Sequence, residues 1–269
     1  MAKQKKPQKK KRRLGCLPGL LGILLISLIA VAVLRQPESA EPAVPEETVP
    51  FRAEDFVWEN GRKRCISRES IPGIDVSYYQ GQVDWEQVRA SGIEFVFVRV
   101  GYRSAADGKL CEDEMARQNL SGAAAAGLKV GAYFFSQALT PQEAVEEAAF
   151  AVSIVKHFRL DLPLVYDWEE VENTTRTQGM TRQALTTCTR AFCLTVEAAG
   201  YDSMIYFNRD ISRRLLDLDR LSNYPVWFAM YDSYPDAPCQ PDYWQYTDEG
   251  TVPGIEGYVD LNLYFPEES

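Results

Sequence analysis

From residue 71 to the end of the 269-residue chain, short runs of β-branched and aromatic residues alternate with segments of helical periodicity. This pattern predicts strands at 73–77, 94–102, 128–136, 162–169, 203–208, 224–231, 242–247 and near 258–261, and helices at 83–92, 112–127, 140–158 and 181–200. Near-continuous apolar strands separated by helices are typical of a parallel sheet that helices cover. We therefore expect an α/β fold, a modified (β/α) barrel of the TIM type, which is irregular because its last third has few helical patterns. An open, doubly wound sheet is the alternative, although no glycine-rich phosphate-binding loop follows the first strand.

The N-terminal region has a different character. Residues 1–13 are rich in Lys and Arg, and residues 14–34 form an uncharged apolar run of 21 residues that would span about 30 Å as a helix. We expect a basic cytoplasmic segment (1–13), a single transmembrane signal anchor (14–34) and an extracellular remainder. A cleaved signal peptide, and hence secretion, is the alternative. Residues 35–70 form a Pro/Glu-rich linker and a lead-in segment, in which an Asn-Gly pair at 60–61 indicates a short hairpin.

Charge and histidine content exclude several classes of protein. Residues 1–35 hold nine basic side chains and no acid, so the formal net charge of −9 leaves −18 on residues 36–269. Such a surface would repel a polyanion, which excludes a nucleic-acid partner. His157 is the single histidine, so a Ser-His-Asp triad or a zinc site with two imidazoles is a poor candidate. We expect carboxylate chemistry that needs no metal and no other cofactor.

Acidic residues fall at the ends of three predicted strands. Asp75 lies in the first strand, Asp167 and Glu169 end the run VYDWE, and Asp260 lies in the last element. In such barrels the active site is at the carboxyl ends of the strands. Asp167 and Glu169 are two residues apart and therefore share one side of their strand. Two neighbouring acids do not both ionise at their free pKa values, so one of them is suited to be a general acid. An Asp-x-Glu pair by itself is a weak signal.

Aromatic residues gather near the same strand ends. Flat aromatic rings stack on sugar rings, and acid pairs cleave glycosidic bonds. Ordinary packing inside the barrel is the alternative for about half of them. The aromatic residues at or near predicted strand ends are Tyr78, Tyr79, Tyr133, Tyr166, Tyr206, Trp227 and Trp244.

The sequence resembles a known family at this point. Residues 73–103, GIDVSYYQGQVDWEQVRASGIEFVFVRVGYR, are similar to the opening of the glycoside hydrolase family 25 muramidases, the Chalaropsis-type lysozymes. Further similar blocks follow in the family's order, and together they cover a domain that we place at 71–269. They are VGAYFFSQA (130–138), PLVYDWE (163–169), IYFN (205–208) and WQYTDEGTVPGIEGYVDLNLY (244–264).

The resemblance implies an N-acetylmuramidase that cleaves the β-1,4 bond between N-acetylmuramic acid and N-acetylglucosamine in peptidoglycan. It implies that Glu169 is the general acid, that Asp167 orients the substrate acetamide or acts on water, and that Asp75 and Asp260 support charge and position. Gln245, in the closing block, joins the candidate substrate-binding residues Tyr78, Tyr133, Tyr166, Tyr206, Trp227 and Trp244. Trp168 departs from the family's pattern, where a smaller residue is more common.

Two alternatives stay open. The chain could be a non-catalytic module that binds peptidoglycan in the cell envelope, or a glycosidase for another polymer of N-acetyl sugars such as chitin. The expected partners are glycan strands of the wall, with the membrane reached through residues 14–34. Retaining or inverting stereochemistry, the oligomeric state and the pairing of the cysteines are not determined by the sequence.

Overall fold

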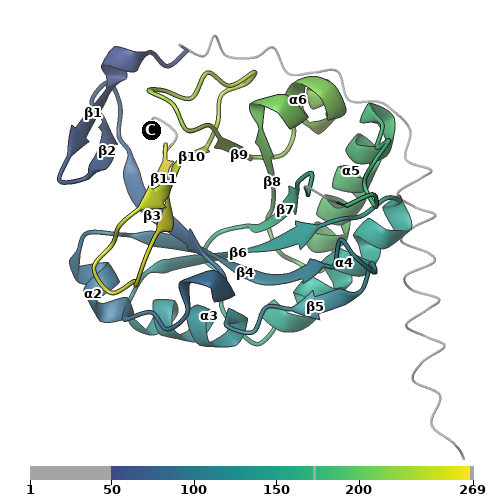
Figure 1. Ribbon diagram of the computed structural model, residues 1–269, viewed down its shortest axis with the longest axis horizontal. Helices are drawn as coiled ribbons and strands as arrows, with labels where there is room; N and C mark the ends of the chain where they lie inside the picture. Colours follow the sequence, from purple (N-terminus) through teal and green to yellow (C-terminus); the bar gives the residue numbers. More distant parts are fainter. Residues whose placement is uncertain (1–49, 172–173, 267–269) are drawn as a thin grey trace, which may run out of the picture. The chain divides into compact units, whose positions relative to one another are not determined.

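The computed structural model describes residues 50–171 and 174–266 (Figure 1). The expected cytoplasmic segment (1–13), the expected anchor (14–34) and residues 35–49 of the linker lie outside the described residues. Within the described residues, no helix is both long enough and apolar enough to cross a membrane.

Eight strands close into a barrel. In spatial order they run β3, β11, β10, β9, β8, β7, β6 and β4, and pairing of β4 with β3 closes the ring. All neighbours are parallel except β11, which is antiparallel to both β10 and β3. The expected TIM-like barrel is thus confirmed, and β11 is its main irregularity. The strands are β3 (Ile71–Val76), β4 (Phe95–Arg103), β6 (Lys129–Ser136), β7 (Leu164–Trp168), β8 (Ser203–Asn208), β9 (Val226–Ala229), β10 (Tyr243–Gly250) and β11 (Val259–Tyr264); a short β5 (Leu110–Glu112), which the sequence did not predict, pairs with β4.

The four expected helices are present, with shorter ends, and cover the barrel along β3 to β8 (Figure 1). Local sequence explains the start of the helix expected at 140–158: the Thr140 hydroxyl accepts a hydrogen bond from the Glu143 amide, and Pro141 occupies the first turn. Between α6 (Arg209–Leu215) and β9 the chain forms a 3-10 helix, η3 (Leu218–Leu221). The helices are α2 (Trp85–Ala90), α3 (Ala116–Ala125), α4 (Pro141–Val155), α5 (Arg182–Ala198) and α6 (Arg209–Leu215).

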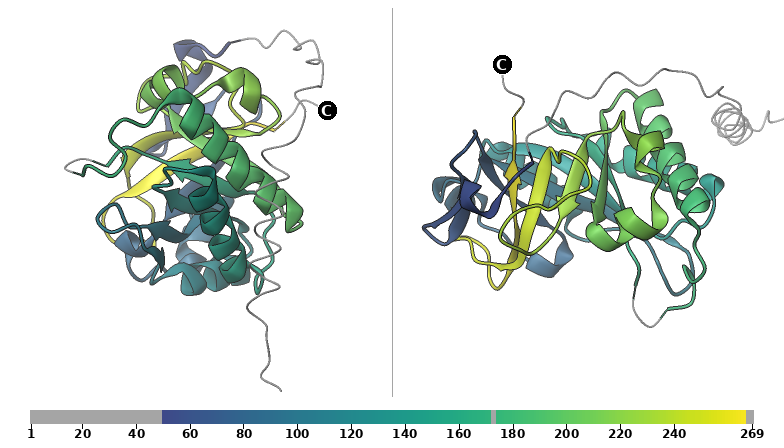
Figure 2. Two further views of the ribbon diagram at one scale, coloured as in Figure 1. Left: turned by 90° about the vertical axis from the view of Figure 1, so that its right-hand side faces the viewer. Right: turned by 90° about the horizontal axis from the view of Figure 1, so that it is seen from above.

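A hairpin takes the place of a helix outside β10 and β11. It consists of β1 (Phe56–Glu59) and β2 (Arg62–Cys65), after a 3-10 turn η1 (Ala53–Asp55). Its turn residues Asn60 and Gly61 both have positive φ, as a tight hairpin turn requires, so the predicted hairpin is confirmed. The Phe56 ring packs at 4.8 Å on Trp244 of β10, and Figure 2 shows the hairpin beside these strands. The lead-in segment is therefore packed against the barrel.

Aromatic side chains fill the lower part of the barrel. Phe97 stacks on Trp227 across the interior at 4.8 Å, and both belong to a buried cluster with Phe95, Tyr133, Val165, Met204 and Tyr243. Gly73 makes room for this cluster, because a Cβ atom there would lie 2.3 Å from the Phe95 ring. The interior is consequently a packed core, and the cavity of about 250 Å³ lies beyond it, at the carboxyl ends of the strands.

Candidate active site

Inward-facing side chains change from apolar to polar along β4 and β10. On β4 the inward series is Phe95, Phe97 and Arg99, and on β10 Tyr243 is followed by Gln245. The polar ends meet at the carboxyl end of the barrel around a cavity of about 250 Å³. The cavity is lined by Asp75, Ser77, Tyr79, Gln80, Arg99, Tyr133, Phe135, Asp167, Glu169, Tyr206, Trp227, Tyr231, Gln245 and Asp260.

The cavity contains all four acids that the sequence singled out. Asp75 and Asp260 face each other as paired residues of antiparallel strands β3 and β11. Asp167 lies in β7, and Glu169 follows the last residue of that strand. Strands far apart in the sequence thus bring four carboxyl groups into one cavity.

Two amides hold the carboxyl group of Asp75. Gln245 donates from Nε2 to Oδ2 of Asp75 at 2.9 Å, and Asn262 donates from Nδ2 to the same oxygen at 2.8 Å. All three side chains are buried. Donors on a single oxygen favour the ionised form of Asp75 and fix the orientation of its carboxyl group.

The side-chain carbonyl oxygens of Gln245 and Asn262 also accept hydrogen bonds. The hydroxyl groups of Tyr206 and Tyr231 donate to Oε1 of Gln245 at 2.9 and 3.1 Å. The indole of Trp227 donates to Oδ1 of Asn262 at 2.8 Å. Because the carbonyl oxygen of each amide accepts these bonds, its NH₂ group must point at the acid. Tyr206 and Trp227 therefore form part of the support of Asp75.

Burial changes the pKa values of the acids. It raises the pKa of Asp75 to about 6 and that of Asp260 to about 9, with a neighbouring negative charge adding to each rise. Burial, and then the charge of Glu169, raises the pKa of Asp167 well above its usual value. Burial also raises the pKa of Glu169, and a hydrogen bond from the hydroxyl of Tyr206 partly opposes this rise. The four carboxyl groups therefore hold their protons to a higher pH than free carboxyl groups do, and a carboxyl group that is protonated near neutral pH is suited to general acid catalysis.

One cation faces these acids. Arg99 is 8% exposed and donates from Nε to Oδ2 of Asp113 at 2.8 Å. Its guanidinium group lies 5.0 Å from the ring of Tyr78 and 5.3 Å from that of Tyr79. The positive charge lowers the pKa of Asp75 and of Asp167. Tyr78 thus lies over Arg99 at the rim and does not line the cavity itself.

Two of the predicted substrate-binding residues point away from the cavity, which corrects their assignment. Tyr166 packs on Phe192 of α5 at 4.9 Å, and Trp244 packs on Phe56 of the hairpin. Both are almost fully buried. Successive residues of a strand face opposite sides, so the inward Asp167 and Gln245 send their preceding neighbours outward. Tyr133, Tyr206, Trp227 and Gln245 do line the cavity.

Arg99, Asn262 and Tyr231 are three of the site residues that sequence reasoning missed. Arg99 had a signal, because it interrupts an otherwise apolar strand. Asn262 had a weaker one, since it lies two residues after Asp260 and therefore on the same side of β11. Tyr231 had none, because it lies in the loop after β9 and reaches the cavity only through the fold.

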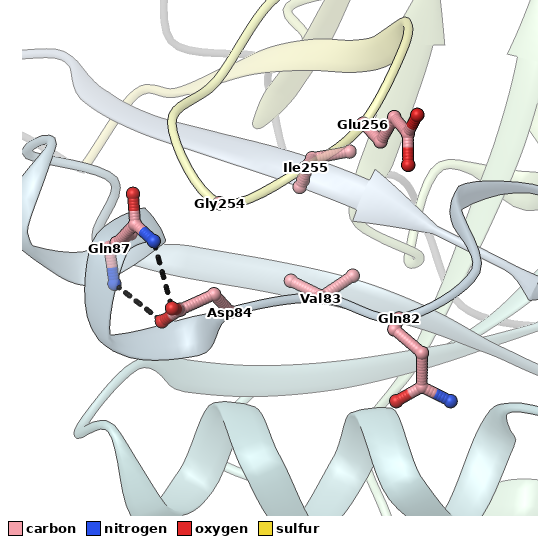
Figure 3. Close-up of a pocket in the computed structure, with 7 residues that line it drawn as sticks. All are labelled: Gln82, Val83, Asp84, Gln87, Gly254, Ile255 and Glu256. Carbon is pink, nitrogen blue, oxygen red and sulfur yellow. Dashed lines mark hydrogen bonds between the residues drawn. The ribbon is translucent and has the colours of Figure 1, made fainter.

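A second, shallow hollow lies between α2 and the loop before β11 (Figure 3). It shares no lining residue with the acidic cavity. The carboxyl group of Asp84 there accepts hydrogen bonds from the backbone N and from Nε2 of Gln87, at 3.1 and 2.8 Å, and so caps α2. Among the described residues, no cluster of three or more His, Cys, Asp or Glu is arranged to hold a metal ion.

The sequence profile described as "Glycosyl hydrolases family 25" matches residues 74–255. The chain belongs to this family. Membership places it among the glycoside hydrolases, which confirms the enzyme class expected from the sequence.

Named relatives agree with the family. The chain is 29% identical over 195 residues to the "Autolytic lysozyme" of Clostridium acetobutylicum, covering 72% of this chain and 56% of that protein. It therefore spans just over half the length of that relative. It is 25% identical to "Lysozyme M1" of Streptomyces globisporus, covering 93% of this chain and 88% of the relative.

Solved structures share the fold. The autolysin LytC of Streptococcus pneumoniae, in complex with a synthetic peptidoglycan ligand, superposes with a TM-score of 0.67 at 22% identity, covering 78% of this chain and 52% of that one. A family 25 glycosyl hydrolase from Bacillus anthracis superposes with a TM-score of 0.65 at 23% identity, covering 76% and 93%.

Proposed function

We propose that this chain is an N-acetylmuramidase that hydrolyses the β-1,4 bond between N-acetylmuramic acid and N-acetylglucosamine in cell-wall glycan. The observation that carries the proposal is the cavity at the carboxyl end of the barrel, where Glu169 lies with three further acids. A lysozyme among the relatives and a peptidoglycan ligand on a structural neighbour support this choice of substrate.

In the proposed mechanism, Glu169 is the general acid. The rise in its pKa favours the protonated carboxyl group, and this proton is transferred to the glycosidic oxygen as the bond to the anomeric carbon breaks. Positive charge then develops on the sugar ring. Asp75, ionised above a pH of about 6 and held by two amides, stabilises that charge. Asp167 orients the acetamide or the attacking water, and Asp260, whose raised pKa of about 9 leaves it protonated near neutral pH, helps to position the substrate.

Substrate contacts are proposed for residues that face the cavity or its rim. Tyr133, Trp227 and Gln245 form the floor and inner wall, together with Tyr206. At the rim, Tyr78 is 39% exposed, so its ring is available to a sugar face.

The location of the enzyme follows from the proposed substrate. We propose an extracellular catalytic domain, tethered to the cell membrane by residues 14–34, with residues 1–13 in the cytoplasm. Residues 35–70 would then separate the anchor from the domain at 71–269, although the hairpin within them packs on the barrel. Secretion after cleavage of the N-terminal segment is the alternative.

The test is Glu169→Gln, assayed on purified peptidoglycan with mass analysis of the products. We expect reducing-sugar release to fall at least about 100-fold, because the amide group is not acidic enough to protonate the leaving oxygen. Glu170→Gln is the matched control: Glu170 is the exposed neighbour, paired with Arg214, and its variant should remain active.

Other outcomes would contradict parts of the proposal. Undiminished activity of Glu169→Gln would refute the assignment of the general acid. Binding to insoluble wall without any turnover by the unaltered chain would favour the non-catalytic module. Cleavage of chitin oligomers in preference to peptidoglycan would refute the proposed bond.

A further inference from the structure

Gln137 links the ends of two neighbouring strands directly behind the proposed general acid. It follows the last residue of β6, is fully buried, and donates from Nε2 to the backbone carbonyl of Glu169 at 2.7 Å. The same nitrogen donates to the carbonyl of Ser136 at 2.8 Å. β7 ends at Trp168, so Glu169 is not paired with β6 through backbone hydrogen bonds. The side-chain amide of Gln137 binds the backbone carbonyl of Glu169 instead.

The backbone of Gln137 is itself fixed by hydrogen bonds to charged side chains. Its backbone N donates to the carboxyl group of Glu147 at 3.4 Å, and the hydroxyl of Ser136 donates to the other oxygen of that group at 2.5 Å. Glu147 is fully buried on α4 and paired with Arg103 at 2.6 Å. The carbonyl of Gln137 accepts from Nε of Arg176 at 3.1 Å. The end of β6 is therefore a fixed platform made of charged hydrogen bonds.

The amide of Gln137 is only half satisfied. Its Oε1 is buried and has no hydrogen-bond partner among the described residues. A buried acceptor without a partner is unfavourable, so an amide at this position contributes through its NH₂ group. One of the two carbonyls that this group reaches belongs to Glu169.

We propose that Gln137 is a positioning residue for the general acid. By holding the carbonyl of Glu169, it fixes where the backbone leaves β7 and thereby where the Glu169 carboxyl group stands relative to Asp167 and Asp75. The proposal rests on the proposed function, since it assumes that Glu169 donates the proton.

The test is Gln137→Met, which keeps the length of the side chain and removes both donors. We expect kcat on purified peptidoglycan to fall about tenfold or more, because small displacements of a catalytic group are costly, while KM changes less than about twofold. The alkaline limb of the kcat profile should also move, because a displaced Glu169 carboxyl group changes its burial and hence its pKa. A residue that only stabilised the fold would lower the melting temperature and the active fraction without moving that limb.

Gln178→Met is the matched control. Gln178 also donates from its amide to a backbone carbonyl, that of Thr174 at 3.3 Å, but it is exposed and contacts none of the acids. Its kcat and pH profile should equal those of the unaltered chain.

Gln137→Glu is the second variant, in case Gln137→Met does not fold. A protonated Glu side chain retains one donor toward the Glu169 carbonyl and an ionised one retains none. Its kcat should approach that of the unaltered chain at low pH and fall increasingly below it as the pH rises. A kcat within twofold of the unaltered chain across the pH range, in either variant, would overturn the inference. Full activity of Glu169→Gln would instead refute the proposed function.

Discussion

Replacing Asp75 by Asn is expected to stabilise the chain at neutral pH while it inactivates the enzyme. The side chain is 5% exposed, and burial raises its pKa from 3.8 to about 6. The oxygen that accepts from Gln245 and Asn262 has a counterpart in the carbonyl oxygen of an Asn side chain. Both hydrogen bonds can therefore persist while the negative charge is lost.

The sign and size of the effect follow from proton linkage. A carboxyl group with a raised pKa in the folded state keeps its proton on folding between its unfolded pKa and its folded pKa. Over that window the folded state binds more protons than the unfolded state, so stability falls as the pH rises from about 3.8 to about 6. A shift of about two pKa units corresponds to about 3 kcal/mol at pH 7. Asp75→Asn should therefore raise the free energy of unfolding by about 3 kcal/mol at pH 7 and change it little at a pH of about 4.

Urea unfolding and thermal melting at these two pH values form the assay. For a domain of this size, about 3 kcal/mol corresponds to a rise in melting temperature of roughly 6–12 °C. Activity on peptidoglycan should fall at least about 100-fold, because an electrostatic contact to the developing charge is lost. Asp107→Asn is the control: Asp107 is exposed and its pKa is lowered to about 2 by hydrogen bonds from Lys109 and Ser104, so this variant should gain no stability at neutral pH.

Two results would refute the reasoning. One is an Asp75→Asn variant that is less stable than the unaltered chain at pH 7. The other is a gain in stability of the same size at both pH values, because a gain that does not depend on pH cannot come from the removed charge.

Two further predictions concern residues outside the acid cluster. Lys63 of the hairpin donates from Nζ to the carbonyls of Asp232 and Ser233 at 2.7 and 2.9 Å, in the loop that carries Tyr231. Lys63→Met should lower the free energy of unfolding by about 1–3 kcal/mol, because both hydrogen bonds are lost. It should also raise KM more than it lowers kcat. An unchanged KM in steady-state assays would show that the hairpin does not affect substrate binding. Tyr166→Phe should leave KM unchanged, because Tyr166 is buried and faces α5. A several-fold rise in KM would show that Tyr166 does contribute to substrate binding.

Local patterns predicted most of the fold. Thr140 and Pro141 mark the start of α4, the Asn-Gly pair marks the hairpin turn, and apolar runs mark the eight barrel strands. These features depend on neighbours in the sequence and on side-chain periodicity, which a single sequence displays. The antiparallel direction of β11 could not be read in this way, because a strand of six residues has the same alternation in both directions.

The sequence by itself determined the family and predicted carboxylate chemistry, because it has one histidine, acids at predicted strand ends and a family 25 pattern. Only the tertiary structure decided which side chains share the cavity. It turned Tyr166 and Trp244 outward, brought Arg99, Asn262 and Tyr231 to the acids, and set Gln137 behind Glu169. The physical reason is that strand periodicity gives the side of the strand, whereas the closure of the barrel selects which side becomes the inside.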